Sequence, residues 1–405
     1  MDAHSLSRYN WRRILIIKPS AFGDVLHTLP VLVKLRRRYP EAEIDWLITP
    51  ENAEAVRYHP ALNHVVLFPR REVRLFGQGR LSWRKWWQLL TELRTRRYEL
   101  VLDLQGLLRS GLLTWWTGAQ VRIGFDRPRR GLRAPRDRLA SHCQHGWRGT
   151  REGAWLAYTH CLPITNLDVH AVDRYLWVGR WLGFDDSPPD LRVYWPRDAD
   201  SWAEELVCRE IGRQPFAVIA PGTVWPTKRW PVEGYAEVAR RLLADGLRVV
   251  LIGSPRDTEV CRAVHSQVPQ ALNLAGQTRI TQLMALMHRA TVCLTNDSGP
   301  MHLAVALGKP LVAIFGPTDP VRIGPYGRPQ AVLQAQLPCV PCYFRHLTQC
   351  PYQHACMHAI RPQHVLTRMY ESLDGRLMHT PHLSGFPTGV HQGGPTTDAF
   401  GQQGR

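Results

Sequence analysis

Apolar and polar positions alternate in blocks along the first half of the chain, where short apolar runs are each followed by a polar turn or an amphipathic stretch. Runs of about four to eight apolar residues between turn signals are typical of buried strands. The strands expected here are 14–17, 43–49, 64–68 and 99–103. We also expect a helix from about Val25 and a helical segment over 170–184. Strands that alternate with helices predict a largely parallel, doubly wound sheet.

The second half of the chain repeats this rhythm. Its expected strands are 216–220, 248–252, 291–295 and 311–315, and its expected helices include 231–243 and 281–289. Prolines at 188, 189 and 196 mark a linker between the halves. The predicted fold class is therefore α/β, with two doubly wound, Rossmann-like domains that face each other across a ligand cleft at the carboxyl ends of their strands.

The domain boundaries follow from the same pattern. We expect an N-terminal domain over 1–188 and a C-terminal domain over 189–372. Residues 373–405 are rich in Gly, Pro, Thr, Gln and His, a composition that predicts a disordered tail.

A polar turn, Asn296-Asp297-Ser298-Gly299, separates an expected strand from an expected helix. Such a unit presents free backbone N–H groups and the positive end of a helix to a bound phosphate. Asp297 or Ser298 can cap the helix, and Gly299 lets a ligand approach the backbone. His302 falls one turn inside, on the face that looks back at the turn. The alternative is an ordinary crossover with a capped helix and a packed histidine.

Composition adds a strong positive charge to this picture. The 405 residues include 51 Lys+Arg against 34 Asp+Glu, a net charge of +17, which favours nucleic acid, an anionic membrane surface or phosphate-bearing substrates as partners. The apolar runs are too short to span a bilayer, and the first residues lack a signal-type apolar region. We expect a cytoplasmic protein. Nine Cys in a chain of this length do not indicate a secreted disulfide scaffold.

Several motifs occur in an order that resembles one enzyme family. The chain is similar to the lipopolysaccharide heptosyltransferases, which are GT-B fold glycosyltransferases that use ADP-heptose, and most similar to the heptosyltransferase II type. The agreement spans roughly residues 12–370, so chance is a poor explanation. The motifs are KPSAFGDVLHTLP (18–30), DLQGLLRSG (103–111), APGTVWPTKRWP (220–231), GSPRD (253–257), TNDSGPMHLAVALGKP (295–310) and FGPTDP (315–320).

The resemblance implies a donor site in the second domain, an acceptor site in the first, and inversion at the anomeric carbon without a metal or other cofactor. It implies ADP-heptose as donor and an anionic acceptor that carries keto-octulosonate acids and lipid A phosphates. We accordingly expect a monomer that lies peripherally on the anionic inner leaflet of the inner membrane, without a nucleic-acid partner.

Asp24 and Lys228 match the family's catalytic positions. Asp24 resembles the base that deprotonates the acceptor hydroxyl, although its position also suits an N-cap for a helix from Val25. Gly23 beside it allows the backbone to approach a substrate. Lys228 resembles the lysine that meets the donor phosphates, where a mobile ammonium suits growing negative charge. The alternative for Lys228 is a solvated loop cation.

The remaining donor contacts implied by the resemblance lie in the second half. Thr223 follows Pro-Gly and offers a hydroxyl to a phosphate. Asp257 follows a strand, as does a carboxylate that binds ribose hydroxyls, and Glu259 competes for that role. The other donor positions are Asp297, Ser298, Gly299 and His302.

Basic residues of the first half form the expected acceptor site. They are Arg70, Arg71, Arg84 and Lys85, together with Gly23. Arginine suits the recognition of carboxylates and phosphates. The Trp residues around Arg84 also suit an interfacial anchor at a membrane, because indole favours the headgroup zone. The alternative is a helix with Trp packed inward and Arg in solvent. The Arg-rich loop 127–138 is expected to provide surface attraction rather than a site.

Four cysteines occur close together, at Cys339, Cys342, Cys350 and Cys356. Their spacing could hold a structural Zn²⁺, but we favour reduced, packed thiols. Two other functions stay open. One is the same fold with another nucleotide sugar or envelope glycan acceptor. The other is nucleic-acid binding, which the charge suggests but which the nucleotide-diphosphate motifs of the second half argue against.

Overall fold

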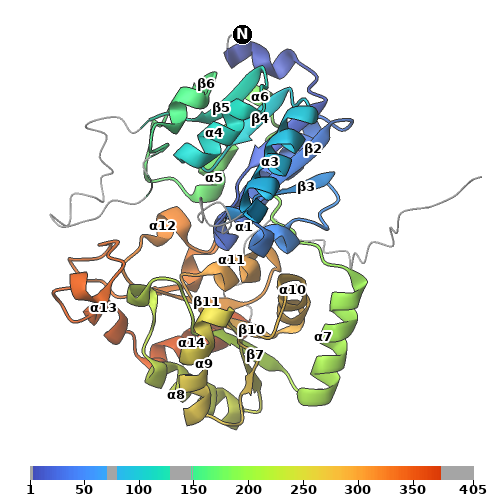
Figure 1. Cartoon of the computed structure of the whole chain (residues 1–405). Coiled ribbons are helices and arrows are strands. Elements are labelled where there is room, and N and C mark those ends of the chain that lie inside the picture. Colours follow the sequence, from blue (N-terminus) through green and yellow to red (C-terminus); the bar gives the residue numbers. More distant parts are fainter. Residues whose placement is uncertain (1–2, 71–79, 128–146, 148, 375–405) are drawn as a thin grey trace, which may run out of the picture.

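The computed structural model describes residues 3–70, 80–127, 147 and 149–374, and it forms two α/β units (Figure 1). The first unit has a six-stranded sheet of order β3-β2-β1-β4-β5-β6, in which all neighbouring strands are parallel. Its strands are β1 (Arg13–Ile17), β2 (Glu43–Ile48), β3 (His64–Leu67), β4 (Leu100–Asp103), β5 (Val121–Phe125) and β6 (His160–Leu162).

Helices cover both faces of this sheet. The α-helices are α1 (Phe22–Arg38), α3 (Arg80–Thr95), α4 (Leu108–Trp116), α5 (Ala171–Leu176) and α6 (Gly179–Leu182). Short 3₁₀ helices complete the unit: η1 (Ala3–Arg8), η2 (Pro50–Ala55) and η4 (Ala154–Ala157).

The second unit has a parallel sheet of order β12-β11-β10-β7-β8-β9. Counted within its own unit, each sheet has the strand order 3-2-1-4-5-6, so both are doubly wound. The second set of strands is β7 (Phe216–Ala220), β8 (Arg248–Leu251), β9 (Leu272–Asn273), β10 (Val292–Asn296), β11 (Leu311–Phe315) and β12 (Val332–Gln334). The predicted fold class is confirmed.

Helices also surround the second sheet. They are α7 (Arg197–Glu210), α8 (Val232–Ala244), α9 (Thr258–Gln267), α10 (Ile280–Arg289), α11 (Gly299–Ala306), α12 (Pro320–Ile323), α13 (Ala355–His358) and α14 (Pro362–Leu373). Its 3₁₀ helices are η5 (Pro226–Lys228), η6 (Pro255–Asp257), η7 (Pro329–Ala331) and η8 (Leu347–Gln349).

Alternation along β1 divides the first core into two layers, because successive side chains of a strand point to opposite faces. Ile14 and Ile16 belong to the cluster that includes the buried side of α1. Leu15 and Ile17 belong to a second cluster, which includes buried residues of α3 and α4. Both α3 and α4 therefore cover the same face of the first sheet, opposite α1.

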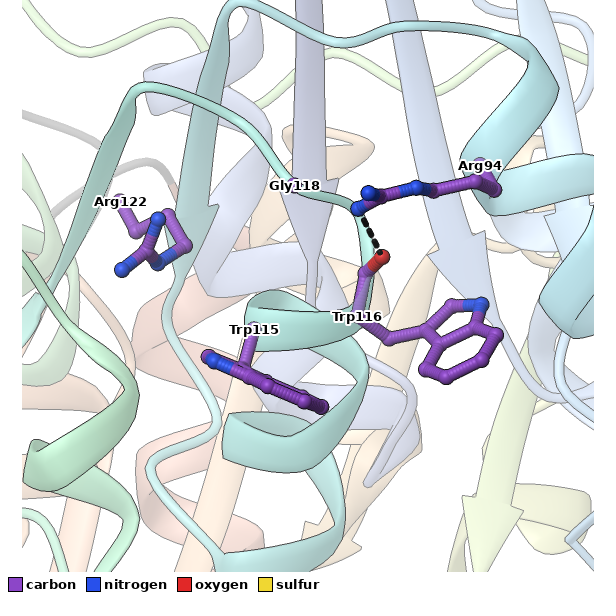
Figure 2. Close-up of a pocket in the computed structure, with 5 residues that line it drawn as sticks. All are labelled: Arg94, Trp115, Trp116, Gly118 and Arg122. Atoms are coloured by element: carbon purple, nitrogen blue, oxygen red, sulfur yellow. Dashed lines mark hydrogen bonds between the residues drawn. The ribbon is translucent and has the colours of Figure 1, made fainter.

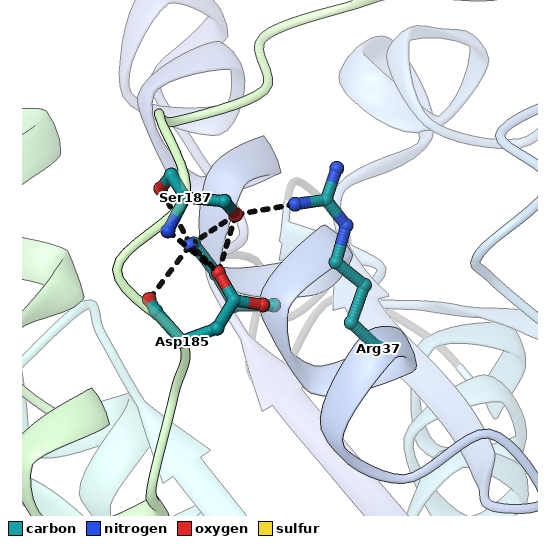
Figure 3. A network of polar contacts seen from close by, with 4 residues as sticks. Arg37, Asp185 and Ser187 are labelled. Carbon is teal, nitrogen blue, oxygen red and sulfur yellow. Dashed lines mark hydrogen bonds and ion pairs between the residues drawn. The ribbon is translucent and has the colours of Figure 1, made fainter.

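The segment after α6 leads into the second unit and is held against α1 (Figure 3). The buried ammonium of Lys34 donates to Ser187 Oγ at 2.7 Å and forms an ion pair with Asp185. The hydrogen bond from Lys34 holds the pKa of Asp185 well below its ordinary value. Arg37, one turn further along α1, also donates to Ser187. The predicted division at 188/189 falls just beyond this attachment and stays a prediction.

Two local expectations differ from the structure. The first helix begins at Phe22 rather than near Val25, so Asp24 is inside its first turn. The expected helical segment 170–184 is divided into α5 and α6, and it ends at Gly183, which has a φ of 70° that suits glycine.

Three predictions concern residues largely outside the described part of the chain: Arg71, the Arg-rich loop 127–138 and the tail 373–405. Only Arg127, at the start of the loop, and Leu373 and Asp374, at the end of α14, are described. Within the described ranges, no helix combines the length and the apolar character that crossing a membrane requires.

Candidate active site

The first turns of α1 and α11 come from opposite units and pack directly against each other. A Cβ at Gly23 would lie 2.3 Å from the Cδ2 of His302. Reciprocally, a Cβ at Gly299 would lie 2.5 Å from Cδ1 of Phe22. Both glycines therefore allow close helix contact. For Gly23 this differs from the expected reason, which was the approach of a substrate.

A hydrogen bond joins the two units at this contact. His27 Nε2 lies 2.9 Å from His302 Nδ1, and both side chains are buried. Burial lowers the pKa of His302 to about 4 and holds the pKa of His27 well below its ordinary value, so both rings are neutral near pH 7. The expected alternative of a packed histidine thus describes part of what His302 does.

Asp24 lies at the third position of α1, beside this junction. Its Oδ2 accepts from the N–H of Ala21 at 3.2 Å, and its Oδ1 accepts from the hydroxyl of Tyr175 at 3.3 Å. Burial alone would raise the pKa of Asp24, but the Lys18 ammonium and the Ala21 N–H lower it below its ordinary value. One carboxylate thus supports the helix start and stays ionised at neutral pH. It is not the N-cap residue, which is Ala21.

Lys18, at the end of β1, supplies the positive charge that faces Asp24. Its side chain is buried, donates to the carbonyl of Leu104 at 3.1 Å and lies 4.8 Å from the ring centre of Tyr175. Burial would lower the pKa of Lys18, but Asp24 and Tyr175 raise it above its ordinary value. The two groups therefore keep each other charged.

A second buried cation, Arg174, lies on α5 next to Tyr175. Its guanidinium stacks over the ring of Trp147 at 3.9 Å, and its Nε has no hydrogen-bond partner among the described residues. Burial lowers the pKa of Arg174, and the residue also contributes to the lowered pKa of Asp24. The surroundings of Asp24 thus carry a surplus of positive charge.

On the second unit, Lys228 forms an ion pair with Asp297, with Nζ 2.6 Å from Oδ2. The two side chains are only 12% and 5% exposed, so Lys228 is not the solvated loop cation of the alternative interpretation. The same Oδ2 accepts from the hydroxyl of Thr318 at 2.6 Å. Lys228 also lies 4.4 Å from the ring centre of Trp225. The ammonium is therefore held in place beside the turn that contains Asp297.

Thr223 and Ser298 flank this ion pair. Thr223 is buried, and its hydroxyl lies 3.5 Å from the carbonyl oxygen of Asp297. Ser298 is the N-cap residue of α11, although its hydroxyl donates to the carbonyl of Asn296 rather than capping the helix. The first N–H groups of a helix have no acceptor within the helix, which leaves this end suited to an anion.

Asp257 lies at the end of η6, beside the loop that follows β7. A Cβ at Gly222 would lie 2.2 Å from the Asp257 carboxyl carbon, so glycine is needed there. The carboxylate accepts from the N–H and the hydroxyl of Ser254 at 2.9 and 2.6 Å. Glu259 is exposed on α9. The structure therefore places Asp257, and not its competitor, against the Thr223 loop.

The expected acceptor residues are more dispersed. Arg70 is exposed and donates to Ser20 at 3.1 Å, which places it beside the segment between β1 and α1. Arg84 and Lys85 are exposed on α3. An acceptor role for these residues stays a prediction.

The four clustered cysteines are free thiols. Burial, together with Cys342, raises the pKa of Cys356 to about 12, so without a bound metal this thiol is protonated at neutral pH. Within the ranges that the structure describes, no group of three or more His, Cys, Asp or Glu side chains is arranged to hold a metal ion. The structure thus gives no support to the zinc alternative.

Sequence reasoning missed four residues that surround Asp24 and His302: Lys18, His27, Arg174 and Tyr175. Lys18 and His27 belong to the motif KPSAFGDVLHTLP, so that motif contained a signal for both. Arg174 and Tyr175 lie about 150 residues away, in the segment 170–184 that was predicted only to be helical, and packing brings them to Asp24.

Known proteins are similar to this chain in fold and in sequence. Lipopolysaccharide heptosyltransferase 1 of Pseudomonas aeruginosa is 31% identical over 375 residues, which cover 88% of this chain and 97% of that protein. Lipopolysaccharide heptosyltransferase 2 of Escherichia coli is 30% identical over 324 residues, covering 76% and 84%. The chain is thus about equally similar to heptosyltransferases of the two types.

A solved structure of the E. coli heptosyltransferase WaaC with ADP-2-deoxy-2-fluoro heptose superposes with a TM-score of 0.61 at 26% identity, covering 80% of this chain and 93% of that one. The sequence pattern of glycosyltransferase family 9 (heptosyltransferase) matches residues 86–142 and 136–353. By its sequence and its fold, the chain belongs to glycosyltransferase family 9, the heptosyltransferases, and it holds Asp24 and the Lys228–Asp297 pair where its two units meet.

Proposed function

We propose that this enzyme transfers heptose from ADP-heptose to the inner core of lipopolysaccharide, with inversion at the anomeric carbon and without a metal ion. One observation carries the proposal. The first turn of α1, which contains Asp24, packs against the first turn of α11, and Asp297, just before α11, holds Lys228 in an ion pair. The proposed base and the proposed phosphate-binding cation therefore come from opposite units to one junction.

Asp24 would accept the proton of the acceptor hydroxyl. It is ionised at neutral pH, because Lys18 and the Ala21 N–H oppose the effect of burial on its pKa. The oxygen then attacks the anomeric carbon from the side opposite the diphosphate, which inverts the configuration. Tyr175, which donates to Asp24, would hold the carboxylate in position.

Lys228 would meet the negative charge that grows on the departing ADP. A carboxylate repels a diphosphate, so we assign Asp297 to the positioning of Lys228 rather than to direct contact. The N–H groups at the start of α11 add a second source of positive potential. An ammonium and a helix end together can supply the stabilisation that a divalent ion gives in other transferases, which supports a metal-independent reaction.

The donor and acceptor assignments rest on the relatives and on charge. WaaC was solved with an ADP-heptose analogue, and the relatives are named for lipopolysaccharide. Arg70, beside the segment that leads into α1, suits an anionic acceptor. Since that acceptor is a lipid, we propose that the enzyme works peripherally on the inner membrane, and we keep the expectation of a monomer as a separate proposal.

The test incubates the purified full chain with ADP-heptose and a panel of truncated core acceptors, with and without EDTA. UDP-sugars serve as competing donors. Release of ADP and a product of inverted anomeric configuration by NMR, unchanged by EDTA, are expected. Retention of configuration, abolition by EDTA, or preference for a UDP-sugar would each overturn the corresponding part of the proposal.

A further inference from the structure

Exposed apolar side chains gather on the outer side of α3 and α4. Trp83 and Trp87 are 55% and 63% exposed on α3, one helical turn apart. Leu108, Leu112 and Trp115 are 46%, 55% and 59% exposed on α4, at the i, i+4 and i+7 spacing of one helix face. We call these five residues the α3–α4 face.

The two helices present this face together because both cover the same side of the first sheet. Leu89 and Leu93 of α3 and Leu113 of α4 are buried in one cluster beneath them. Trp116 of α4 donates through Nε1 to the carbonyl of Leu90 on α3 at 2.8 Å, which ties the helices side by side. Figure 1 shows α3 and α4 in front of the upper sheet.

A cavity of about 370 Å³ opens at the carboxyl ends of these helices (Figure 2). Arg94, Trp115, Trp116, Gly118 and Arg122 line it. Gly118 has a φ of +70°, and a Cβ there would lie 2.1 Å from Nη1 of Arg94. The glycine therefore makes room for the Arg94 side chain, which extends across it.

Both arginines of this cavity are held by backbone carbonyls. Arg94 donates to the carbonyl of Trp116 at 3.2 Å. Arg122 donates to Ala157 and Ala119, each at 2.7 Å. In the part of the chain that the structure describes, the hydrogen-bond partners of both guanidiniums are carbonyl oxygens, and neither is paired with a carboxylate. Two fixed positive charges flanked by indole rings suit a phosphate at an apolar boundary.

We propose that the α3–α4 face docks on an anionic phospholipid bilayer, with a lipid headgroup phosphate in the cavity between Arg94 and Arg122. The proposal deepens the proposed function, because it names the surface through which the enzyme reaches a lipid acceptor. Tryptophan favours the headgroup zone, and leucine penetrates the acyl boundary. Exposed cations on the same helices, Arg84 and Arg109, add attraction to the anionic surface.

Charge also argues against a second copy of this chain as the occupant. In a two-fold symmetric contact the same patch meets itself. The arginines of the face and its cavity would then oppose one another, with no carboxylate partner among the described residues to offset Arg94 and Arg122. An anionic bilayer offers complementary charge instead.

The experiment measures binding of the full chain to vesicles of phosphatidylglycerol with phosphatidylcholine, and of phosphatidylcholine alone, by flotation. The test variant combines Trp87→Gln, Leu112→Gln and Trp115→Gln, all at exposed positions, so folding is preserved. The control variant combines Tyr58→Gln, Leu347→Gln and Tyr352→Gln, which are 43%, 50% and 55% exposed elsewhere. Arg94→Gln is compared with Arg209→Gln, an exposed cation on α7.

We expect the wild-type chain to prefer the anionic vesicles and to bind less as salt rises. The test variant should lose about tenfold or more in partition, and Arg94→Gln about fivefold on anionic vesicles. Both control variants should bind like the wild type. Equal binding by the test variant and the wild type would overturn the proposal. Equal binding of the wild-type chain to anionic and neutral vesicles would also overturn it. So would a wild-type dimer that is lost in the test variant and kept in the control variants.

Transfer to a deacylated, water-soluble acceptor separates this inference from the proposed function. The test variant should retain wild-type transfer to that acceptor while losing vesicle binding. If the wild type shows no transfer at all, the proposed function fails and the vesicle result still decides the docking surface.

Discussion

His27 and His302 share a hydrogen bond of 2.9 Å that links α1 of the first unit to α11 of the second. His170 adds a third ring, edge-on to His27 with centroids 5.1 Å apart, and its Nε2 lies 3.0 Å from the carbonyl of Gly324. Burial lowers the pKa of His302, and the charges of Asp297, Asp24 and Lys228 modify that pKa further. The contact between the two units thus includes His27 and His302, whose buried rings are neutral near pH 7.

This arrangement predicts that acid weakens the fold. Burial lowers the pKa of His302 from 6.5 to about 4, and the pKa of His27 is lowered as well. The unfolded chain therefore binds protons between pH 6.5 and about 4 that the folded chain excludes, so stability is full above pH 6.5 and falls as pH is lowered through this window. Each such group can contribute up to about 1.4 kcal/mol per pH unit.

Urea unfolding at pH 7.5, 6 and 5 can measure this loss in the wild type and in His27→Gln. Glutamine can still hydrogen-bond to His302 but does not titrate, so the variant should lose less stability in acid. His27→Leu leaves the partner nitrogen of His302 unsatisfied and should cost about 1–3 kcal/mol already at pH 7.5. Identical pH dependence in the wild type and His27→Gln would contradict the assignment.

Asp24→Asn should nearly abolish transfer while leaving donor binding intact. Removal of a general base typically lowers the rate by about 10²–10⁴-fold, and asparagine can still accept from the N–H of Ala21. Single-turnover rates and ADP titration measure the two quantities separately. Because the pKa of Asp24 is lowered from 3.8, the rate should not lose this base between pH 5 and 8.

Tyr175→Phe is the matched control for Asp24. It removes the hydroxyl that lies 3.3 Å from Oδ1 but leaves the carboxylate, so a smaller loss of rate is expected. A rate in Asp24→Asn equal to that of the wild type would exclude the proposed base, and a loss in Tyr175→Phe as large as in Asp24→Asn would show that position rather than basicity limits the reaction.

Strands of the parallel sheets could be predicted from the sequence because burial on both faces gives continuous apolar runs. The runs at 216–220 and 311–315 match β7 and β11 residue for residue. Strands such as β6 and β12 were not predicted. Each has three residues, too few to show a period, and β12 is only half-buried.

Much of the candidate site could be named from motifs, but its contacts could not. Gly23 and His302 are 279 positions apart, and nothing local reveals that one makes room for the other. The pairing of Lys228 with Asp297 likewise depends on how η5 and the β10 turn meet in space. Burial determines which charged side chains, such as Lys228 and Asp297, form fixed ion pairs, and burial is known only once the chain is folded.

The Lys228–Asp297 pair predicts two different mutant effects. Lys228→Gln should lower transfer by about 10²–10³-fold, because it removes a cation that meets the leaving diphosphate. Asp297→Asn keeps that cation but leaves a largely buried ammonium unpaired, a loss on the order of 3–5 kcal/mol in buried ion pairs. We therefore expect Asp297→Asn to have a lower Tm than the wild type without ligand. Addition of ADP should raise the Tm of Asp297→Asn by more than it raises the Tm of the wild type.

Thermal unfolding with and without ADP tests this difference, and Arg241→Gln, in an exposed pair with Asp245, serves as the control with little expected effect. If ADP stabilises Asp297→Asn less than the wild type, the carboxylate contacts the ligand directly and does not merely position Lys228.

The reciprocal glycine contacts predict a strict size limit at the junction. Gly23→Ala would place a methyl group 2.3 Å from the His302 ring, and Gly299→Ala would place one 2.5 Å from Phe22. Alanine favours a helix over glycine by about 1 kcal/mol, yet we expect both variants to lose about 1–3 kcal/mol, because the overpacked helices must move apart. Urea unfolding and transfer assays measure the outcome.

Two further variants show whether the cause is the contact between the units. Phe22→Ala removes the ring that Gly299→Ala would strike, so the double variant should recover stability, whereas Phe22→Ala should not rescue Gly23→Ala. Gly111→Ala meets Ala154 at 2.9 Å within the first unit, so it should lower stability without changing the affinity for ADP. Equal rescue of both glycine variants by Phe22→Ala would show that the two contacts are not separate, because a ring that relieves both must lie between both helices.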